Sequence, residues 1–193
     1  MNPRKTKYLI MLCGLPGTGK TVRARKLKEG LENFKIIDQN EIRRKHGMQR
    51  MPKTQDAFLR EIDRRAARFL NKGVGVIFDS VNRYTFRRQQ MYGVASCSNA
   101  RVITLEIVCS EKTAKARMRQ RNKSDGLLSD PANTKVYDKL KALWQDVKID
   151  FTYPGEDHVS WAQFDSDKQK FKAIIARAED KKILKEIKGI LEG

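Results

Sequence analysis

The sequence is poor in the residues from which disulfide frameworks and metal sites are usually built. It has only 3 cysteines and 2 histidines, and Cys13, Cys97 and Cys109 show no CxxC spacing. We therefore expect neither a disulfide-stapled fold nor a metal site made of cysteine and histidine ligands. We interpret the cysteines as small apolar side chains, because Cys13 and Cys109 end apolar runs.

Long apolar runs are also missing near the basic start of the chain. The run after residues 1–7 covers only residues 8–13, which is too short for a signal peptide and far too short for a membrane span. We expect no membrane partner and a cytoplasmic location. No linker, repeat or low-complexity tract divides the chain, so we expect a single domain over 1–193.

Negative charge is in deficit. The chain carries 41 Lys and Arg against 23 Asp and Glu, a formal net charge of +18. A field of this sign attracts polyanions and favours nucleic acid or a phosphorylated substrate as a partner. A solvated basic surface would explain the same composition, so the positions of the charges have to decide between the two interpretations.

Short apolar runs alternate with longer amphipathic ones, which is typical of a parallel sheet covered by helices. The predicted fold class is α/β, a three-layer α/β/α arrangement with a mostly parallel five-stranded sheet. The predicted strands are 8–13, 34–37, 74–79, 102–109 and 158–164, the last at an edge. The predicted helices are 19–30, 54–71, 84–95, 111–122, 132–146 and a basic amphipathic one at 167–190.

Residues 14–21 read GLPGTGKT, a complete P-loop between an apolar run and a helix. Its glycines let the backbone curl so that successive N–H groups point at phosphate oxygens. Lys20 adds a charge for the β- and γ-phosphates, and the hydroxyl of Thr21 suits Mg²⁺. We predict that ATP or another nucleoside triphosphate binds here. The predicted ligands are Gly14, Leu15, Pro16, Gly17, Thr18, Gly19, Lys20 and Thr21.

A phosphate site that binds Mg²⁺ usually also has a carboxylate at the end of a neighbouring strand. Asp79 ends the run VGVIFD in the manner of a Walker-B aspartate, and we assign it to the Mg²⁺ site together with Thr21. A turn or cap residue is the structural alternative.

With these motifs the chain resembles the P-loop kinases related to polynucleotide kinase and to the kinases of seryl-tRNA, over about residues 6–145. That family typically has Asp-Glu-(Ile/Leu)-Arg after the second strand, and this chain has Asn40-Glu41-Ile42-Arg43. The family also has Asp-x-x-Asn followed by an arginine pair, and Asp79, Asn82, Arg87 and Arg88 of this chain match that pattern. The resemblance implies a P-loop kinase-like fold.

The resemblance also implies a helical lid at about 111–132, with two arginines four residues apart and a Ser-Asp loop. Arg117 and Arg121 match the arginines, and 129–130 matches the loop. Residues at i and i+4 share one helix face, so both guanidinium groups can lean over the phosphates. There they would stabilise charge on the transferring phosphoryl group, and Arg117 would also contact the nucleotide.

The chain departs from the family at Asn40, where the family has the aspartate that accepts the proton of the attacking hydroxyl. Three interpretations are open. Asp38 takes this role, Asn40 merely orients the hydroxyl, or phosphotransfer is weak or lost. We place Asp38 first as a hypothesis, because it keeps a carboxylate at the end of the strand.

Basic stretches follow the predicted strand ends, where parallel sheets bind their ligands. They include 43–53 and 112–123, which favours a large anionic acceptor. We assign Arg43 to the acceptor side and predict substrate contacts for Asn82, Arg83, Arg87 and Arg88.

The predicted function is an ATP-dependent kinase acting on a hydroxyl, first of all a polynucleotide 5′-OH or a tRNA-linked group. The alternatives are a small-molecule kinase of the same fold and a nucleic-acid-binding module without transfer. The sequence does not predict an oligomeric state.

Overall fold

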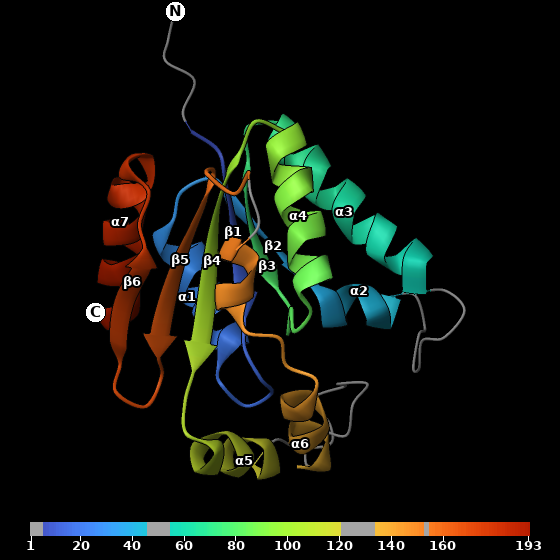
Figure 1. Cartoon of the computed structure of the whole chain (residues 1–193), viewed down its shortest axis with the longest axis vertical. Coiled ribbons are helices and arrows are strands. Elements are labelled where there is room, and N and C mark those ends of the chain that lie inside the picture. Colours follow the sequence, from blue (N-terminus) through green and yellow to red (C-terminus); the bar gives the residue numbers. More distant parts are fainter. Residues whose placement is uncertain (1–5, 46–54, 121–133, 153–154) are drawn as a thin grey trace, which may run out of the picture.

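The computed structural model describes residues 6–45, 55–120, 134–152 and 155–193. Its centre is a six-stranded sheet with the order β2-β3-β1-β4-β5-β6 (Figure 1). The first five strands run parallel, and β6 is antiparallel to β5. The strands are β1 Tyr8–Cys13, β2 Phe34–Asp38, β3 Gly75–Asp79, β4 Arg101–Val108, β5 Val159–Asp165 and β6 Lys170–Ile175.

Helices cover both faces of this sheet, so the molecule has three layers (Figure 1). The α-helices are α1 Lys20–Gly30, α2 Gln39–Lys45, α3 Gln55–Asn71, α4 Thr85–Cys97, α5 Glu111–Arg119, α6 Lys135–Ala142 and α7 Lys181–Glu192. Two short 3-10 helices, η2 Val147–Thr152 and η3 Ala178–Asp180, complete the described elements. One apolar core holds α3 and α4 against the sheet, and a second holds α1 and α7 against the other face.

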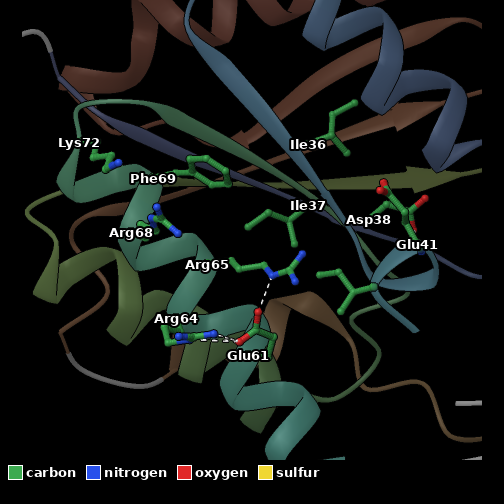
Figure 2. A pocket seen from close by; sticks show the side chains of 11 residues that line it. Ile36, Ile37, Asp38, Glu41, Glu61, Arg64, Arg65, Arg68, Phe69 and Lys72 are labelled. Atoms are coloured by element: carbon green, nitrogen blue, oxygen red, sulfur yellow. Dashed lines mark hydrogen bonds and ion pairs between the residues drawn. The ribbon is translucent and has the colours of Figure 1, made fainter. Parts of the chain in front are cut away.

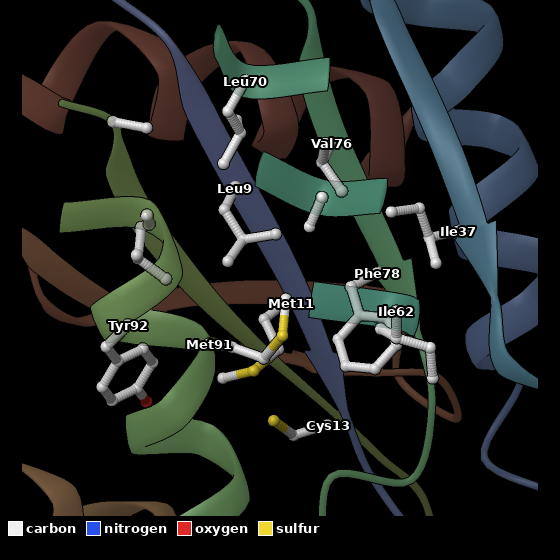
Figure 3. Close-up of a cluster of buried hydrophobic side chains, with 14 of the residues drawn as sticks. Leu9, Met11, Cys13, Ile37, Ile62, Leu70, Val76, Phe78, Met91 and Tyr92 are labelled. Atoms are coloured by element: carbon white, nitrogen blue, oxygen red, sulfur yellow. The ribbon is translucent and has the colours of Figure 1, made fainter. Parts of the chain in front are cut away.

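The β1 strand shows why an apolar run without alternation becomes a central strand. Its side chains point alternately to the two faces. Leu9 and Met11 lie in the core beneath α3 and α4 (Figure 3), whereas Ile10 and Leu12 lie in the core beneath α1 and α7. Both faces are covered by helices, so every position has to be apolar. The predicted three-layer α/β/α fold is confirmed.

The C-terminal part differs from the prediction. We predicted one helix over 167–190 and placed 158–164 at a sheet edge, but a sixth strand, Lys170–Ile175, pairs with β5 and makes it an inner strand. The chain turns back because Asp165 Oδ1 accepts hydrogen bonds from the backbone of Asp167 and Lys168. Gln169 then takes a left-handed φ of 53°. Side-chain-capped turns of this kind compete with helix formation.

Among the described residues, no helix is both long and apolar enough to cross a membrane. The predicted lid is described only up to residue 120, as α5. Arg121 and positions 129–130 lie outside the described residues.

A fully buried ion pair joins α4 to η2. Arg88 and Asp150 are both 0% exposed, and their side chains form two hydrogen bonds of 2.6 Å and 2.7 Å. The remaining N–H groups of Arg88 donate to the carbonyls of Asn82, Gln145 and Asp146 and to the hydroxyl of Thr85. Our prediction that Arg88 contacts a substrate is therefore wrong, because the side chain has neither solvent contact nor a free donor.

We expect Asp150→Asn to lower the free energy of unfolding by about 3–5 kcal/mol, because it leaves the Arg88 charge buried without a counter-ion. Urea denaturation measures this loss. The control is Asp157→Asn, which changes the exposed ion pair of Asp157 with Arg177 and should have little effect. Equal stability of the two variants would show that Arg88 does not need its partner.

Candidate active site

The P-loop backbone is packed so closely that two of its glycines have no room for a side chain. A Cβ atom on Gly14 would lie 2.4 Å from the Ile107 carbonyl oxygen, and one on Gly17 would lie 2.3 Å from that of Ala114. Both residues also have a positive φ, of 149° and 80°, which strongly favours glycine. Glycine at both positions therefore lets the loop pack directly against the backbone of β4 and α5 in this conformation.

Lys20 lies at the start of α1 and reaches back over this loop. Its ammonium group donates to the carbonyls of Gly14 at 2.8 Å and Leu15 at 2.9 Å. The charge is thus held over the residues that are predicted to bind the phosphates. The N-terminus of α1 points to the same place, and helix N-termini favour anions.

Thr21 and Asp79 come together at the ends of α1 and β3. The Thr21 hydroxyl donates to Asp79 Oδ2 at 2.6 Å, and Asp79 is only 4% exposed. Burial raises the pKa of the Asp79 carboxyl, whereas the Thr21 hydrogen bond and the Lys20 charge oppose that rise. A neighbouring cation would likewise favour the ionised carboxylate.

These two oxygen ligands fit a magnesium ion that also binds phosphates. No group of three or more His, Cys, Asp and Glu gathers into a metal site within the described parts of the chain. A Mg²⁺ ion held by Thr21 and Asp79 would thus take its other ligands from phosphate oxygens and water, which is its usual preference in nucleotide sites.

Asp38 ends β2 directly beside Asp79, because the two residues are partners in the β2–β3 register. Its Oδ1 atom accepts hydrogen bonds from the backbone of Asn40 at 2.7 Å and Glu41 at 3.3 Å. Asp38 is therefore the N-cap of α2, a structural role that we did not predict. Among the described residues Oδ2 accepts no hydrogen bond, so one carboxylate oxygen remains for a ligand.

Two arginines, Arg43 of α2 and Arg83 in the connection after β3, follow these carboxylates in the sequence. Arg43 lies over the Phe58 ring and Arg83 over the Tyr84 ring, at 5.5 Å and 4.3 Å. Burial and the charge of Arg83 lower the pKa of Arg43. The Nε atoms of both arginines are buried without a hydrogen-bond partner in the described part of the chain. Two neighbouring positive charges with buried, unpaired N–H donors cost free energy. A bound anion would neutralise the charges and accept these hydrogen bonds, so the pair is suited to an anionic ligand.

Two other predicted substrate contacts belong mainly to the scaffold. Asn82 is 4% exposed, and its Nδ2 atom donates to the Leu12 carbonyl at 2.7 Å. It thereby ties the loop after β3 to the end of β1. Arg87 is also buried and pairs with Asp63 of α3 at 2.7 Å, although its Nη2 atom has no hydrogen-bond partner among the described residues.

Arg117 of α5 lies beside the P-loop. One nitrogen, Nη1, donates to Ser166 Oγ at 2.8 Å and approaches the Gly17 carbonyl at 3.5 Å. The guanidinium group thus joins α5 to the P-loop and to the turn between β5 and β6. Its action on a transferring phosphoryl group stays a prediction.

Sequence reasoning missed a second cation at this end of the P-loop. Arg23 of α1 donates to Gln169 at 3.2 Å and lies 5.2 Å from the centre of the Phe164 ring. Burial and the nearby Arg117 charge lower its pKa. No motif marks Arg23, and its partners lie on β5 and in a turn that we had predicted as helix.

We expect Gly17→Ala to weaken binding of a fluorescent ATP analogue by roughly 10- to 100-fold, because the added Cβ collides with α5 and strains a left-handed residue. Titration of the purified variants measures this. The control is Gly93→Ala in α4, where a Cβ meets nothing within 4 Å and alanine favours the helix. Wild-type affinity in Gly17→Ala would contradict the proposed cradle.

Comparisons with known proteins agree with this geometry. A family model described as an AAA domain matches residues 9–145. A search of curated protein sequences gave no match.

Solved structures with the same architecture include three of particular interest. The Kti12 protein of Chaetomium thermophilum, in complex with ADP-AlF3, is 19% identical over 96% of this chain and 100% of its own, with a TM-score of 0.64. The APS kinase CysC of Mycobacterium tuberculosis, in complex with AMPPNP and APS, is 16% identical over 99% and 100%, with a TM-score of 0.58. A chain of the Pnkp1/Rnl/Hen1 RNA repair complex is 19% identical over 74% of this chain and 46% of its own, with a TM-score of 0.60.

Identities this low show a shared fold alone. The family match, however, extends over well more than half of the sequence and includes the P-loop, Asp38, Asp79 and Arg117. The protein therefore belongs to this AAA domain family and has a P-loop kinase-like fold.

Proposed function

We propose that the protein is an ATP-dependent kinase that transfers the γ-phosphate to a polynucleotide 5′-hydroxyl or a tRNA-linked hydroxyl. One observation carries this proposal. The Thr21–Asp79 pair at the P-loop lies directly beside Asp38 on the next strand. The predicted nucleotide site and a carboxylate whose Oδ2 atom accepts no hydrogen bond from the described residues thus share one end of the sheet.

The donor half consists of the P-loop, Lys20 and the Thr21–Asp79 pair. Lys20 would neutralise the β- and γ-phosphates, and Thr21 and Asp79 would hold Mg²⁺. When bound, Mg²⁺ supplies a positive charge that favours departure of the leaving oxygen. Arg117, which already contacts the P-loop, would stabilise charge on the equatorial oxygens of the phosphoryl group.

The acceptor half consists of Asp38, Asn40, Arg43 and Arg83. In this proposal Asp38 Oδ2 accepts the proton of the attacking hydroxyl while Oδ1 keeps its hydrogen bonds to α2. Arg43 and Arg83 bind an anionic group of the acceptor through their unused donors. The Asp38 contact would also orient the hydroxyl toward the γ-phosphate for in-line attack.

The net charge of +18 supports an acceptor that is itself a polyanion. The fold similarity to a chain of an RNA repair complex agrees with this choice. A small acceptor has support as well, since the chain matches an APS kinase over almost its full length. A nucleic-acid-binding module without transfer is the third possibility, because Asn40 replaces the usual aspartate.

We expect transfer of label from γ-labelled ATP to 5′-hydroxyl RNA, DNA or tRNA. Asp38→Asn should lower kcat by roughly 10²- to 10⁴-fold, because asparagine still caps α2 but accepts no proton. The control is the thermal stability of that variant, which should stay close to that of the wild type. Lys20→Ala should abolish transfer.

The outcomes separate the three possibilities. If Asp38→Asn turned over normally while Lys20→Ala was inactive, the base assignment would be wrong. If wild-type protein bound oligonucleotides in a salt-sensitive manner without labelling them, it would be a binding module. ATP binding without either result would point to a small acceptor.

A further inference from the structure

A groove runs along the outer side of the sheet, between β2 and α3 (Figure 2). Its volume is about 520 Å³. Ile37 and Phe69 contribute apolar side chains, and the long basic side chains of α3 form one wall. Within the described residues β2 pairs only with β3, so this edge of the sheet carries no further strand. We call this space the α3 groove.

The basic wall follows from the spacing of residues on α3. Arg65, Arg68 and Lys72 lie three, four and seven residues apart, and such positions share one helix face. The cations are not equally available. Glu61 pairs with Arg65 at 2.6 Å and also with Arg64, which lowers the pKa of Glu61.

Arg68 and Lys72 are the available cations of the wall. Both are exposed, and neither forms an ion pair with any described residue. They lie together beside Phe69, whereas Asp38 and Glu41 lie at the other end of the groove (Figure 2). Positive and negative charge are therefore separated along its length.

The acidic end of the α3 groove lies at the candidate active site. Asp38 belongs both to the α3 groove and to the pair of strand-end carboxylates beside the P-loop. From Glu61 to Lys72 the helix extends about 16 Å, at 1.5 Å per residue. A ligand in the groove can thus place one end at Asp38 and reach the cations only if it is a chain of several units.

We propose that the α3 groove binds the single-stranded polynucleotide acceptor beyond its reacting hydroxyl. The uncharged hydroxyl end lies at Asp38, the following phosphates lie against Arg68 and Lys72, and an unpaired base lies on Phe69. Stacking on an aromatic ring beside a basic track is how proteins bind single strands without reading sequence. This inference rests on the proposed kinase function.

An acidic peptide paired with the open edge of β2 is the other occupant that such a groove suggests. The charge pattern favours the polynucleotide. An acidic peptide along β2 would meet Asp38 and Glu41 as well as the cations, whereas a strand ending in a hydroxyl brings no charge to the carboxylate end.

The test compares a 5′-hydroxyl decanucleotide with a dinucleotide as acceptors. We expect the double variant Arg68→Glu/Lys72→Glu to raise the KM of the decanucleotide relative to that of the dinucleotide roughly 10- to 100-fold. The salt dependence of decanucleotide binding should fall by about two released counterions. The matched control is Lys182→Glu/Lys185→Glu. It makes the same change of charge at exposed positions of α7 on the opposite face and should leave the ratio unchanged.

Failure of this inference differs from failure of the kinase proposal. If wild-type protein labels oligonucleotides and the α3 double variant keeps the wild-type KM ratio, the groove does not hold the acceptor. If wild-type protein labels no polynucleotide, the proposed function itself fails. If the double variant loses only affinity for a polyglutamate peptide, the acidic peptide is the occupant and our inference is overturned. Circular dichroism melting confirms that both double variants are folded.

Discussion

The buried pair of Arg88 and Asp150 is the contact on which the geometry of the candidate site depends. A charged pair without solvent is costly unless every donor is satisfied, and here the guanidinium group fixes four backbone or hydroxyl oxygens besides Asp150. One of these is the carbonyl of Asn82, whose side chain in turn holds the carbonyl of Leu12. The neighbouring Val81 carbonyl accepts the N–H of Gly14. A continuous series of hydrogen bonds therefore connects η2 to the first residue of the P-loop.

Strand order then decides which side chains meet. Because β3 lies between β2 and β1, Asp79 has the P-loop on one side and Asp38 on the other. The carboxyl ends of parallel strands share one edge, so the proposed donor and acceptor sites lie on adjacent strands. Asp38 has two tasks in this arrangement. It caps α2 with one oxygen and offers the second at the site, and so the helix that carries Arg43 is fixed by the carboxylate that we assign as base.

Much of this arrangement could be predicted from local patterns, and the remainder depends on partners far away in the chain. The apolar runs located five strands within a residue or two, and the P-loop and Asp79 were recognisable from spacing. Arg88 looked like a substrate contact because its partner Asp150 is 62 residues away. The β6 strand looked like helix because nothing in Lys170–Ile175 excludes one, and only the turn held by Asp165 brings Phe171 opposite Phe164. Periodicity reports which face is buried, but not which distant residue covers it.

The positions of the basic residues matter more for ligand binding than the total positive charge of the chain. Exposed lysines of α7 lie on the face opposite α3, so part of the net charge belongs to a solvated surface. Near the site, Arg88 and Arg87 are occupied by Asp150 and Asp63, and Arg65 is occupied by Glu61. The cations left for a ligand are fewer, and they lie at defined places. Arg43 and Arg83 lie near each other after the ends of β2 and β3, whereas Arg68 and Lys72 lie on α3. An acceptor that contacts both places has to be extended and anionic along its length, with an uncharged end at Asp38.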